Sequence, residues 1–316
     1  MEDKITNANH GKFENPHITA DGAARASVAF THPKTLWFNT GTLCNIECVN
    51  CYIDSSPTND ALVYINKNEV GDYLDQLIIY NWQIREIAFT GGEPFMNPEI
   101  IEITRLSLAA GYEVLILTNA MSPMMRKKIQ LGLLNLNAAY PEKLTLRISL
   151  DHYDQTNHDL ERGTGAFKKT LAGMNWLRDS SVRMAVAGRT LWGETDKQSR
   201  SGYSTLFKHQ DYEINAFNHC ETVLFPEIDE TVEVPEITTS CWNTLNKKPD
   251  SLMCASSRMV VKRKGAKKPT VLACTLLAYS PEFELGYSLE TATKDISLNH
   301  PNCAKFCVLG GASCSS

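Results

Sequence analysis

The sequence predicts an α/β fold in which parallel strands alternate with helices. Between residues 35 and 225 of the 316-residue chain, six short apolar stretches are each followed by a turn or a segment of helical spacing. These units recur about every 25 to 50 residues, as do parallel strands joined by right-handed crossovers. The alternation stops near residue 225, which fits a complete eight-fold barrel or a doubly wound sheet less well. We therefore expect a partial (β/α)6, TIM-like barrel with a small cysteine-rich C-terminal extension.

The elements follow one another in a regular order. A strand at Leu36–Thr40 runs into a cysteine-rich loop, and a helix at Asn68–Tyr80 follows. A strand at Arg85–Thr90 ends in a glycine turn. The next helix is capped by Asn97, has Pro98 at its first position and ends at Gly111. The remaining predicted strands are Glu113–Leu117, Lys143–Leu150, Val182–Leu191 and Phe217–Leu224, and the helices between them are Ser122–Leu136, Thr164–Arg178 and a short one near Tyr203–Gln210.

The strand Lys143–Leu150 indicates what lies inside the barrel. Leu144, Leu146, Ile148 and Leu150 point to one face, which should meet the helices. Thr145, Arg147 and Ser149 point to the other face and should line the interior. The lumen of a closed barrel is normally filled with branched apolar side chains, so polar residues there predict a cavity that holds a ligand.

Composition narrows the classes of function. Hydrophobic residues make up 43% of the chain, enough for a large domain with an appendage, and the net charge of −5 gives no reason to expect a nucleic-acid partner. We expect an N-terminal arm at 1–34, which is either loosely ordered or wraps the protein, the barrel at 35–235 and the extension at 236–316. No apolar run approaches the ~18 residues that span a bilayer, and the N-terminus is polar with no secretory signal. We therefore predict a cytoplasmic protein without membrane contact, in which the ten cysteines bind metal rather than form disulfides.

Three cysteines on one loop carry the strongest functional signal. Cys44, Cys48 and Cys51 have the spacing CxxxCxxC and are followed by the aromatic Tyr52. Soft thiolates select iron–sulfur clusters, zinc or copper(I), and no fourth cysteine is near. Three ligands suit a [4Fe–4S] cluster with one open iron, although zinc or three buried thiols remain alternatives. The motif resembles that of the radical S-adenosylmethionine (SAM) superfamily, in which the open iron chelates SAM and one electron cleaves it to methionine and a 5′-deoxyadenosyl radical.

Three further segments lie at strand ends, where parallel α/β folds bind ligands. Gly91-Gly92-Glu93-Pro94 resembles the superfamily's GGEP motif at the methionyl amine of SAM, although such a run is also an ordinary strand-to-helix turn. Thr118-Asn119 resembles Thr-Asn-Gly with Ala120 in place of glycine, so Asn119 either lies near SAM or only caps a helix. Ser149-Leu150-Asp151 and the later His158-Asp159…Arg162-Gly163 resemble SLDG…HDxxRG, with His152 where the family has glycine.

The resemblance also implies roles in this last segment. Ser149 would contact the ribose or carboxylate of SAM, Asp151 would lie in the same site, and Arg162 would pair with the carboxylate. For Arg162, a surface salt bridge is the alternative.

A second cysteine field begins after residue 240. Cys254 and Cys274 flank a predicted β-hairpin with a basic tip, and Cys303, Cys307 and Cys314 follow. This resembles the SPASM/twitch extensions that hold auxiliary [4Fe–4S] clusters, with unusual spacings. The resemblance favours one auxiliary cluster on Cys254, Cys274 and two of the last three cysteines, with Cys241 as a substitute. Zinc, or two clusters of which one has an open iron, are alternatives. Because the extension is too small for a large core, bound metal should supply much of its folding energy.

Several single residues have two readings each. Cys220, on the predicted last strand, either donates hydrogen to a substrate radical or is an inert core thiol. Arg147, Arg183 and Arg189 either line the lumen and bind an anionic substrate or pair with a barrel acid. The basic run at 262–268 either docks an acidic flavodoxin or ferredoxin or is a solvated hairpin tip.

The resemblance therefore implies a radical SAM enzyme. It would take hydrogen from a small-molecule or peptide substrate, receive electrons from a flavodoxin- or ferredoxin-type donor, and use the auxiliary cluster for electron transfer or substrate binding. The short N-terminal arm favours a small molecule, or a peptide presented by another protein. The rival hypothesis is a non-catalytic iron–sulfur or zinc protein that acts as an electron carrier, sensor or scaffold.

Overall fold

A mostly parallel sheet of nine strands organises the chain. The computed structural model describes residues 11–226 and 232–311. The strand order is β10-β9-β8-β2-β3-β4-β5-β6-β7, and every pair from β8 to β7 is parallel, whereas β9 and β10 are antiparallel. The parallel strands are β2 (Thr35–Asn39), β3 (Glu86–Thr90), β4 (Glu113–Thr118), β5 (Leu144–Ser149), β6 (Arg183–Arg189), β7 (Thr222–Phe225) and β8 (Ser257–Val261). The antiparallel edge is formed by β9 (Thr270–Leu272) and β10 (Glu284–Gly286).

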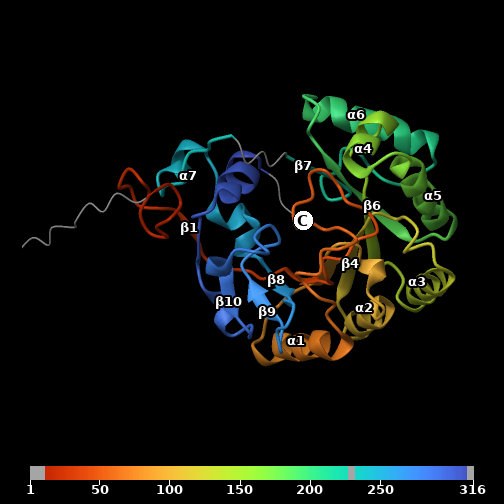
Figure 1. The fold of residues 1–316 in the computed structure, drawn as a ribbon, viewed down its shortest axis with the longest axis horizontal. Coiled ribbons are helices and arrows are strands. Elements are labelled where there is room, and N and C mark those ends of the chain that lie inside the picture. Colours follow the sequence, from red (N-terminus) through yellow and green to blue (C-terminus); the bar gives the residue numbers. More distant parts are fainter. Residues whose placement is uncertain (1–10, 227–231, 312–316) are drawn as a thin grey trace, which may run out of the picture.

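The longer helices lie along the outside of this sheet, and one short helix lies apart from it (Figure 1). The helices are α1 (Lys67–Ile79), α2 (Ile100–Ala109), α3 (Lys127–Ala139), α4 (Gln155–Arg162), α5 (Ala166–Asp179), α6 (Asp196–His209) and the short α7 (Cys241–Thr244). Short 3₁₀ turns lie at Pro94–Met96, Pro249–Ser251, Met253–Ala255, Pro281–Phe283 and Thr291–Thr293, and a π-helix spans Cys303–Leu309. In the described part of the chain the sheet ends at β7 and β10, which do not pair, so the barrel is open. No helix in the described ranges combines the length and apolarity needed to cross a membrane.

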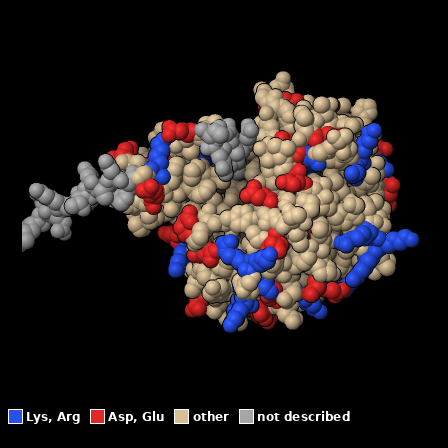
Figure 2. Space-filling model, viewed as in Figure 1, with Lys and Arg blue, Asp and Glu red and all other residues tan. Residues whose placement is uncertain are grey.

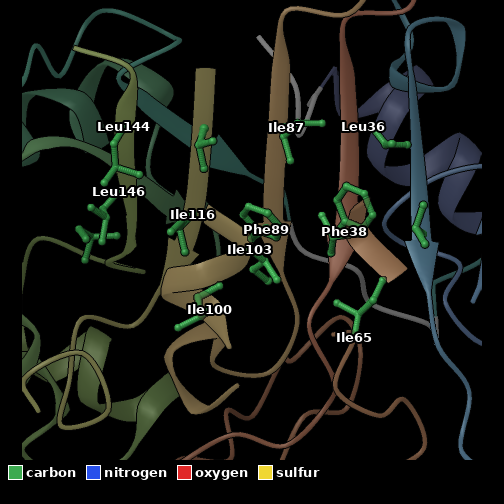
Figure 3. Close-up of a cluster of buried hydrophobic side chains, with 14 of the residues drawn as sticks. Leu36, Phe38, Ile65, Ile87, Phe89, Ile100, Ile103, Ile116, Leu144 and Leu146 are labelled. Atoms are coloured by element: carbon green, nitrogen blue, oxygen red, sulfur yellow. The ribbon is translucent and has the colours of Figure 1, made fainter. Parts of the chain in front are cut away.

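Side chains alternate across a sheet, and the central strands β2 and β8 are buried on both faces. Leu36 and Phe38 of β2 pack outward with helix residues such as Ile103, and Figure 3 shows this outer cluster between sheet and helices. Trp37 points the other way, into a second apolar cluster inside the barrel. On β5, Leu144, Leu146 and Ile148 join the outer cluster, whereas Arg147 and Ser149 face inward. The alternation predicted for this strand is confirmed.

Most element boundaries follow the sequence closely, and two exceptions have identifiable causes. The helix predicted to begin at Pro98, after a cap at Asn97, begins at Ile100, because the Asn97 side-chain amide donates to the Ile65 carbonyl at 2.9 Å and a 3₁₀ turn precedes it. The helix predicted from Ser122 begins only at Lys127, after a tight turn in which Met124 and Met125 donate to Met121. Helix α4, within the segment 155–162, was not predicted.

The C-terminal segment continues the main sheet instead of standing apart from it. The predicted hairpin is present as β8 and β9, and β8 also pairs in parallel with β2. Residues of the predicted arm pack on the same segment: β1 (Ser27–Val28) pairs with β11 (Ile296–Ser297), and Arg25 forms a buried ion pair with Glu236 at 2.5 Å. From residue 11 onward the arm therefore wraps the protein. The domain limits at 34 and 235 stay predictions.

Both readings of Cys220 are wrong. The strand that was to carry it begins at Thr222, and Cys220 lies before it in an exposed turn. It lines a hollow with Thr35, Glu86 and Arg183, which lie at the amino ends of the strands. The thiol is therefore neither a core residue nor close to the opposite end of the sheet, where the strands finish.

Candidate active site

A pocket of about 160 Å³ opens at the carboxyl ends of the parallel strands. The last residue of every strand from β2 to β7 lines it: Asn39, Thr90, Thr118, Ser149, Arg189 and Phe225. Cys44, Cys48 and Cys51, on the loop after β2, line the same pocket. The structure thus brings the predicted cysteine loop to the end of the sheet at which parallel folds bind ligands.

Hydrogen bonds to distant segments hold the cysteine loop. The Cys44 amide donates to the Ser56 carbonyl at 3.0 Å, and the Val49 amide donates to the Glu161 carbonyl of α4 at 2.9 Å. The Asn50 side chain donates to the Glu161 carboxylate at 2.9 and 3.0 Å. Burial raises the pKa of Cys44 to about 12. This thiol is therefore protonated at neutral pH unless a metal ion displaces its proton.

The glycine turn after β3 packs directly on this loop. Gly92 donates to the Gly41 carbonyl at 2.7 Å, and Glu93 donates to the Leu43 carbonyl at 3.1 Å. A Cβ atom on Gly92 would overlap the Leu43 carbonyl, and one on Gly91 would overlap that of Gly41. The lack of side chains at these two positions therefore serves close approach to the cysteine loop as well as to the pocket.

Replacing Gly92 by alanine should consequently displace the cysteine loop. We expect a loss of about 1–3 kcal/mol in the free energy of unfolding, the usual cost of overpacking, together with a reduced capacity to bind iron. Urea denaturation and iron analysis after anaerobic reconstitution measure the two effects. Gly71→Ala is the matched control, because its Cβ would lie 3.6 Å from Leu106 and cause no overlap. Alanine in α1 should stabilise the fold by roughly 0.5–1 kcal/mol. Equal behaviour of the two variants would contradict the role given to Gly92.

Glu93 connects the turns after β3 and β4. Its buried carboxylate accepts hydrogen bonds from the Phe95 amide at 3.1 Å, the Thr118 hydroxyl at 2.8 Å and the Asn119 amide at 2.9 Å. Burial raises the pKa of Glu93 to about 6, despite these donors. Because its oxygens accept these three hydrogen bonds, the Glu93 side chain does not line the pocket. It instead holds the turns after β3 and β4, which do line it.

Asn119 lies at the junction between this turn and the cysteine loop. Its side-chain nitrogen, Nδ2, donates to the Asn45 side-chain oxygen at 2.9 Å and is 4.0 Å from the Cys44 sulfur. Its side-chain oxygen accepts from the Met121 amide at 2.9 Å, so it also closes a turn, but it does not cap α3. Ala120, where the family has glycine, adopts a left-handed backbone with φ of 57°. The backbone shape that favours glycine is thus kept here without glycine.

A buried charge cluster contributes two arginines, Arg162 and Arg189, to the lining of the pocket. Arg162 holds Asp151 through two hydrogen bonds, of 2.7 and 2.9 Å, and Arg189 lies 3.4 Å from the same carboxylate. Burial would raise the pKa of Asp151, but the two guanidiniums outweigh it and lower the pKa overall. Two cations facing one carboxylate leave net positive charge beside the pocket, which favours an anionic ligand.

Arg189 is the member of this cluster that has a side-chain nitrogen available to donate a hydrogen bond to a ligand. Its guanidinium stacks over the Tyr52 ring at 4.5 Å. Its side chain is largely buried, and Nη1 has no hydrogen-bond partner among the described residues. The sequence had offered Arg189 only as one of three candidate arginines. Arg147 and Arg183, the other two, line the hollow at the opposite end of the strands.

The predicted site residues divide into two groups. Tyr52, Gly91, Gly92, Asn119, Ser149 and Arg162 line the pocket with the three cysteines. Glu93, Pro94 and Asp151 are buried and do not line it. The surface-bridge reading of Arg162 is wrong, because the pair with Asp151 is buried. The sequence motifs missed lining residues such as Trp37 and Thr275. The inward register of Trp37 on β2 was a usable signal, whereas no local pattern placed Thr275 here.

The second cysteine field lies next to this pocket. Cys254, Cys274, Cys303 and Cys307 line one small apolar pocket, and Leu276 lines both pockets. Phe306, between Cys303 and Cys307, packs edge-on against Tyr52 with ring centroids 5.7 Å apart. Cys241 does not line this pocket, and Cys314 lies outside the described residues. Four of the predicted auxiliary cysteines are thus gathered at one place.

The donor sets fit clusters better than single ions. In the described ranges, no three histidine, cysteine or acidic side chains converge closely enough to hold one metal ion. A four-iron cluster binds each cysteine through a different iron atom, so its thiolates need not meet at one point. Three cysteines beside a polar, net positive wall fit a [4Fe–4S] cluster with a carboxylate-bearing cosubstrate. The four cysteines in an apolar pocket fit a fully ligated cluster.

Comparison with known proteins agrees with this reading of the site. The AlbA protein of Bacillus subtilis, an antilisterial bacteriocin subtilosin biosynthesis protein, is 31% identical over 180 residues, which are 55% of this chain and 37% of AlbA. The AdoMet-dependent heme synthase of Methanosarcina barkeri is 30% identical over 163 residues, 50% of this chain and 43% of that protein. The match thus spans less than half the length of either relative.

Solved structures share the fold. Streptococcus suis SuiB bound to S-adenosylmethionine superposes with a TM-score of 0.58 and 10% identity over 81% of this chain and 63% of SuiB. The structure of anSMEcpe with bound AdoMet superposes with a TM-score of 0.58 and 14% sequence identity, over 85% of this chain and 82% of anSMEcpe. The predicted partial barrel is confirmed. A model of the radical SAM superfamily matches residues 38–198, about half of the sequence and including the loop with all three cysteines. This chain therefore belongs to the radical SAM superfamily.

Proposed function

We propose that this protein is an enzyme that uses a [4Fe–4S] cluster on Cys44, Cys48 and Cys51 to cleave SAM. The observation that carries the proposal is the pocket itself, in which three cysteines of one loop face the ends of six parallel strands. When bound and reduced, the cluster supplies the electron that splits SAM into methionine and a 5′-deoxyadenosyl radical, which abstracts hydrogen from a substrate. This chemistry fits the reducing cytoplasm, where thiols stay free to bind iron.

The residues around the pocket divide the task of binding SAM. Arg162 and Arg189 supply positive charge for a carboxylate, and Nη1 of Arg189 is a donor with no protein partner among the described residues. The backbone of Gly91 and Gly92 lies open to the pocket for the amino group. Ser149, at the end of β5, offers a hydroxyl on the same wall. Glu93 and Asp151 act from behind by fixing the turns and the arginines.

The substrate that we propose is a small molecule or a peptide. AlbA is named for the biosynthesis of a bacteriocin, and the structures of SuiB and anSMEcpe include complexes with the precursor peptide SuiA and the Cp18Cys peptide. The heme synthase relative is named for a small-molecule product. These names support both classes. A flavodoxin- or ferredoxin-type protein would supply the electron.

The decisive experiment measures SAM cleavage. After anaerobic reconstitution with iron and sulfide, the protein should form 5′-deoxyadenosine and methionine from SAM when dithionite is added. Chromatography with mass detection quantifies both products. A protein that binds iron and sulfide but yields neither product under any reducing condition would instead be an electron carrier, a sensor or a scaffold.

We also infer that Cys254, Cys274, Cys303 and Cys307 hold an auxiliary [4Fe–4S] cluster. The shared wall residue Leu276 and the contact between Phe306 and Tyr52 support a role next to the first pocket. A cluster placed there would exchange an electron with the substrate or help to hold it. This assignment omits Cys314 and Cys241.

Removing two of these cysteines tests the assignment. The double variant Cys254→Ala/Cys274→Ala should retain about half of the iron of the reconstituted wild type, because the SAM cluster keeps its own ligands. It should still cleave SAM with dithionite, although stability should fall because the metal contributes folding energy. Cys220→Ala is the control, since that exposed thiol lines neither pocket and its loss should leave the iron content unchanged. Full iron content in the double variant would refute the assignment.

A further inference from the structure

The cysteine loop reaches the protein surface at a hollow that Met125, just before α3, and Lys169 of α5 also line. A hollow of about 470 Å³ is lined by Asn45 and Ile46 of the loop, by Met121 and Met125, and by Lys169. Asn45 and Ile46 lie between Cys44 and Cys48, so the hollow borders the loop that would hold the SAM cluster. Thr170, next to Lys169, donates to the Asn119 carbonyl at 3.1 Å, which ties α5 to the turn that contacts this loop.

Four lysines stand in pairs at the starts of two helices. Lys127 and Lys128 are the first two residues of α3, and Lys168 and Lys169 lie in the first turn of α5. All four are exposed, and none forms an ion pair within residues 11–226 and 232–311. In Figure 2, lysine and arginine side chains project from the right side of the molecule, where Figure 1 draws α3 and α5. We call these four residues the lysine surface.

These positions are unfavourable for the fold. The positive end of the helix dipole lies at the N-terminus, so lysine in the first turn costs stability and acidic residues are preferred there. Neither helix has an acidic residue in its first turn. The Asp159 carboxylate accepts hydrogen bonds from the Gly165 and Phe167 backbone amides at the start of α5, but it forms no ion pair with Lys168 or Lys169. The charges of the four lysines are thus available for ion pairs with the acidic side chains of a partner protein.

We propose that the lysine surface docks a small acidic electron-transfer protein, which delivers the electron to the cysteine loop. This inference rests on the proposed function, which requires an electron from outside. The exchange at this surface is a single electron: the flavin or iron–sulfur group of the donor is oxidised by one electron, the centre on the cysteine loop is reduced by one, and no bond forms or breaks. Ile46 and Met125, which line the hollow with Lys169, would supply apolar contact, and the lysine surface would supply positive charge.

The other basic segment is a weaker candidate. In the hairpin, Lys262 pairs with Glu69 at 2.5 Å, Lys264 pairs with Asp60 at 2.6 Å, and Arg263 pairs with Glu284. These pairs neutralise most of the run that the sequence offered as a docking site. A nucleic acid is disfavoured as the partner, because the chain as a whole carries a net charge of −5.

The test compares two sets of charge reversals in the full-length reconstituted protein. One variant carries Lys127→Glu, Lys128→Glu, Lys168→Glu and Lys169→Glu, and the control carries Lys267→Glu and Lys268→Glu in the hairpin turn. The first set should not impair folding, because glutamate in a first helical turn is favourable. Binding of an acidic flavodoxin is measured by anaerobic calorimetry at low and high salt. We expect the four-lysine variant to lose about tenfold or more in affinity together with the salt dependence, and the control about twofold or less.

Other readouts separate this proposal from the proposed function. Dithionite needs no docking surface, so 5′-deoxyadenosine formation driven by dithionite tests the function alone. The docking proposal is overturned if the wild type shows no salt-dependent binding of flavodoxin, or if the two variants lose affinity equally. It is also overturned if the four reversals abolish binding to a short RNA or to anionic vesicles while leaving flavodoxin binding intact.

Discussion

Replacing Cys44, Cys48 and Cys51 together by alanine is expected to abolish SAM cleavage and to remove about half of the bound iron. The three thiolates are the protein ligands that we assign to the SAM cluster, and they line one pocket at the carboxyl ends of the strands. No other cysteine lines this pocket, among the residues described, so none is placed to substitute. Formation of 5′-deoxyadenosine should fall to the background of dithionite and SAM without protein. Iron and sulfide analysis, together with electron paramagnetic resonance of the reduced protein, measures the loss.

The iron that remains in this triple variant is informative as well. It should be held by the four cysteines around the second pocket and should give the spectrum of one fully ligated cluster. The spectrum should not change on addition of SAM, because a cluster with four protein ligands has no open iron. Persistent 5′-deoxyadenosine formation in the triple variant would mean that the cysteine loop is not the site of SAM cleavage.

The second large effect is expected at Asp151. Its carboxylate is the shared partner of Arg162 and Arg189, and all three side chains are buried. Asp151→Ala would leave two buried cations without their counter-charge, and the loss of one partner from a buried pair typically costs about 3–5 kcal/mol. Urea denaturation of the reconstituted protein measures this loss. Asp179→Ala is the control, because Asp179 pairs with Arg178 at the surface and should cost less than about 1 kcal/mol.

The same carboxylate predicts a dependence on pH. Because the pKa of Asp151 is lowered in the folded protein, its contribution to stability is complete above the pKa of an unfolded aspartate, ~3.9. The contribution is lost as the pH falls through the lower value of the folded state. Wild type should therefore lose stability on acidification below about pH 4, and the difference between wild type and Asp151→Ala should shrink there. A difference that stays constant down to pH 2 would show that the charge of Asp151 is not what stabilises the wall.

Local patterns in the sequence were sufficient for the parallel core. The alternation in Lys143–Leu150 correctly separated the outer apolar face from the inner polar one, because side-chain direction in a strand follows from position alone. The motif at Cys44, Cys48 and Cys51 identified the superfamily, because its spacing fixes three thiolates on one loop. Boundaries failed where distant contacts intervened, as at Asn97, whose side chain binds the Ile65 carbonyl.

Only the tertiary structure decided how the two cysteine fields and the charged residues are related. Nothing in the sequence near Cys274 shows that Leu276 lines both pockets, since this depends on β8 pairing with β2 across more than 200 residues. The same holds for Arg189, which meets Tyr52 and Asp151 only because adjacent strands end at one edge of the sheet. Spacing along a chain determines the chemistry of a single loop or strand, whereas sites assembled from several elements depend on strand order and packing.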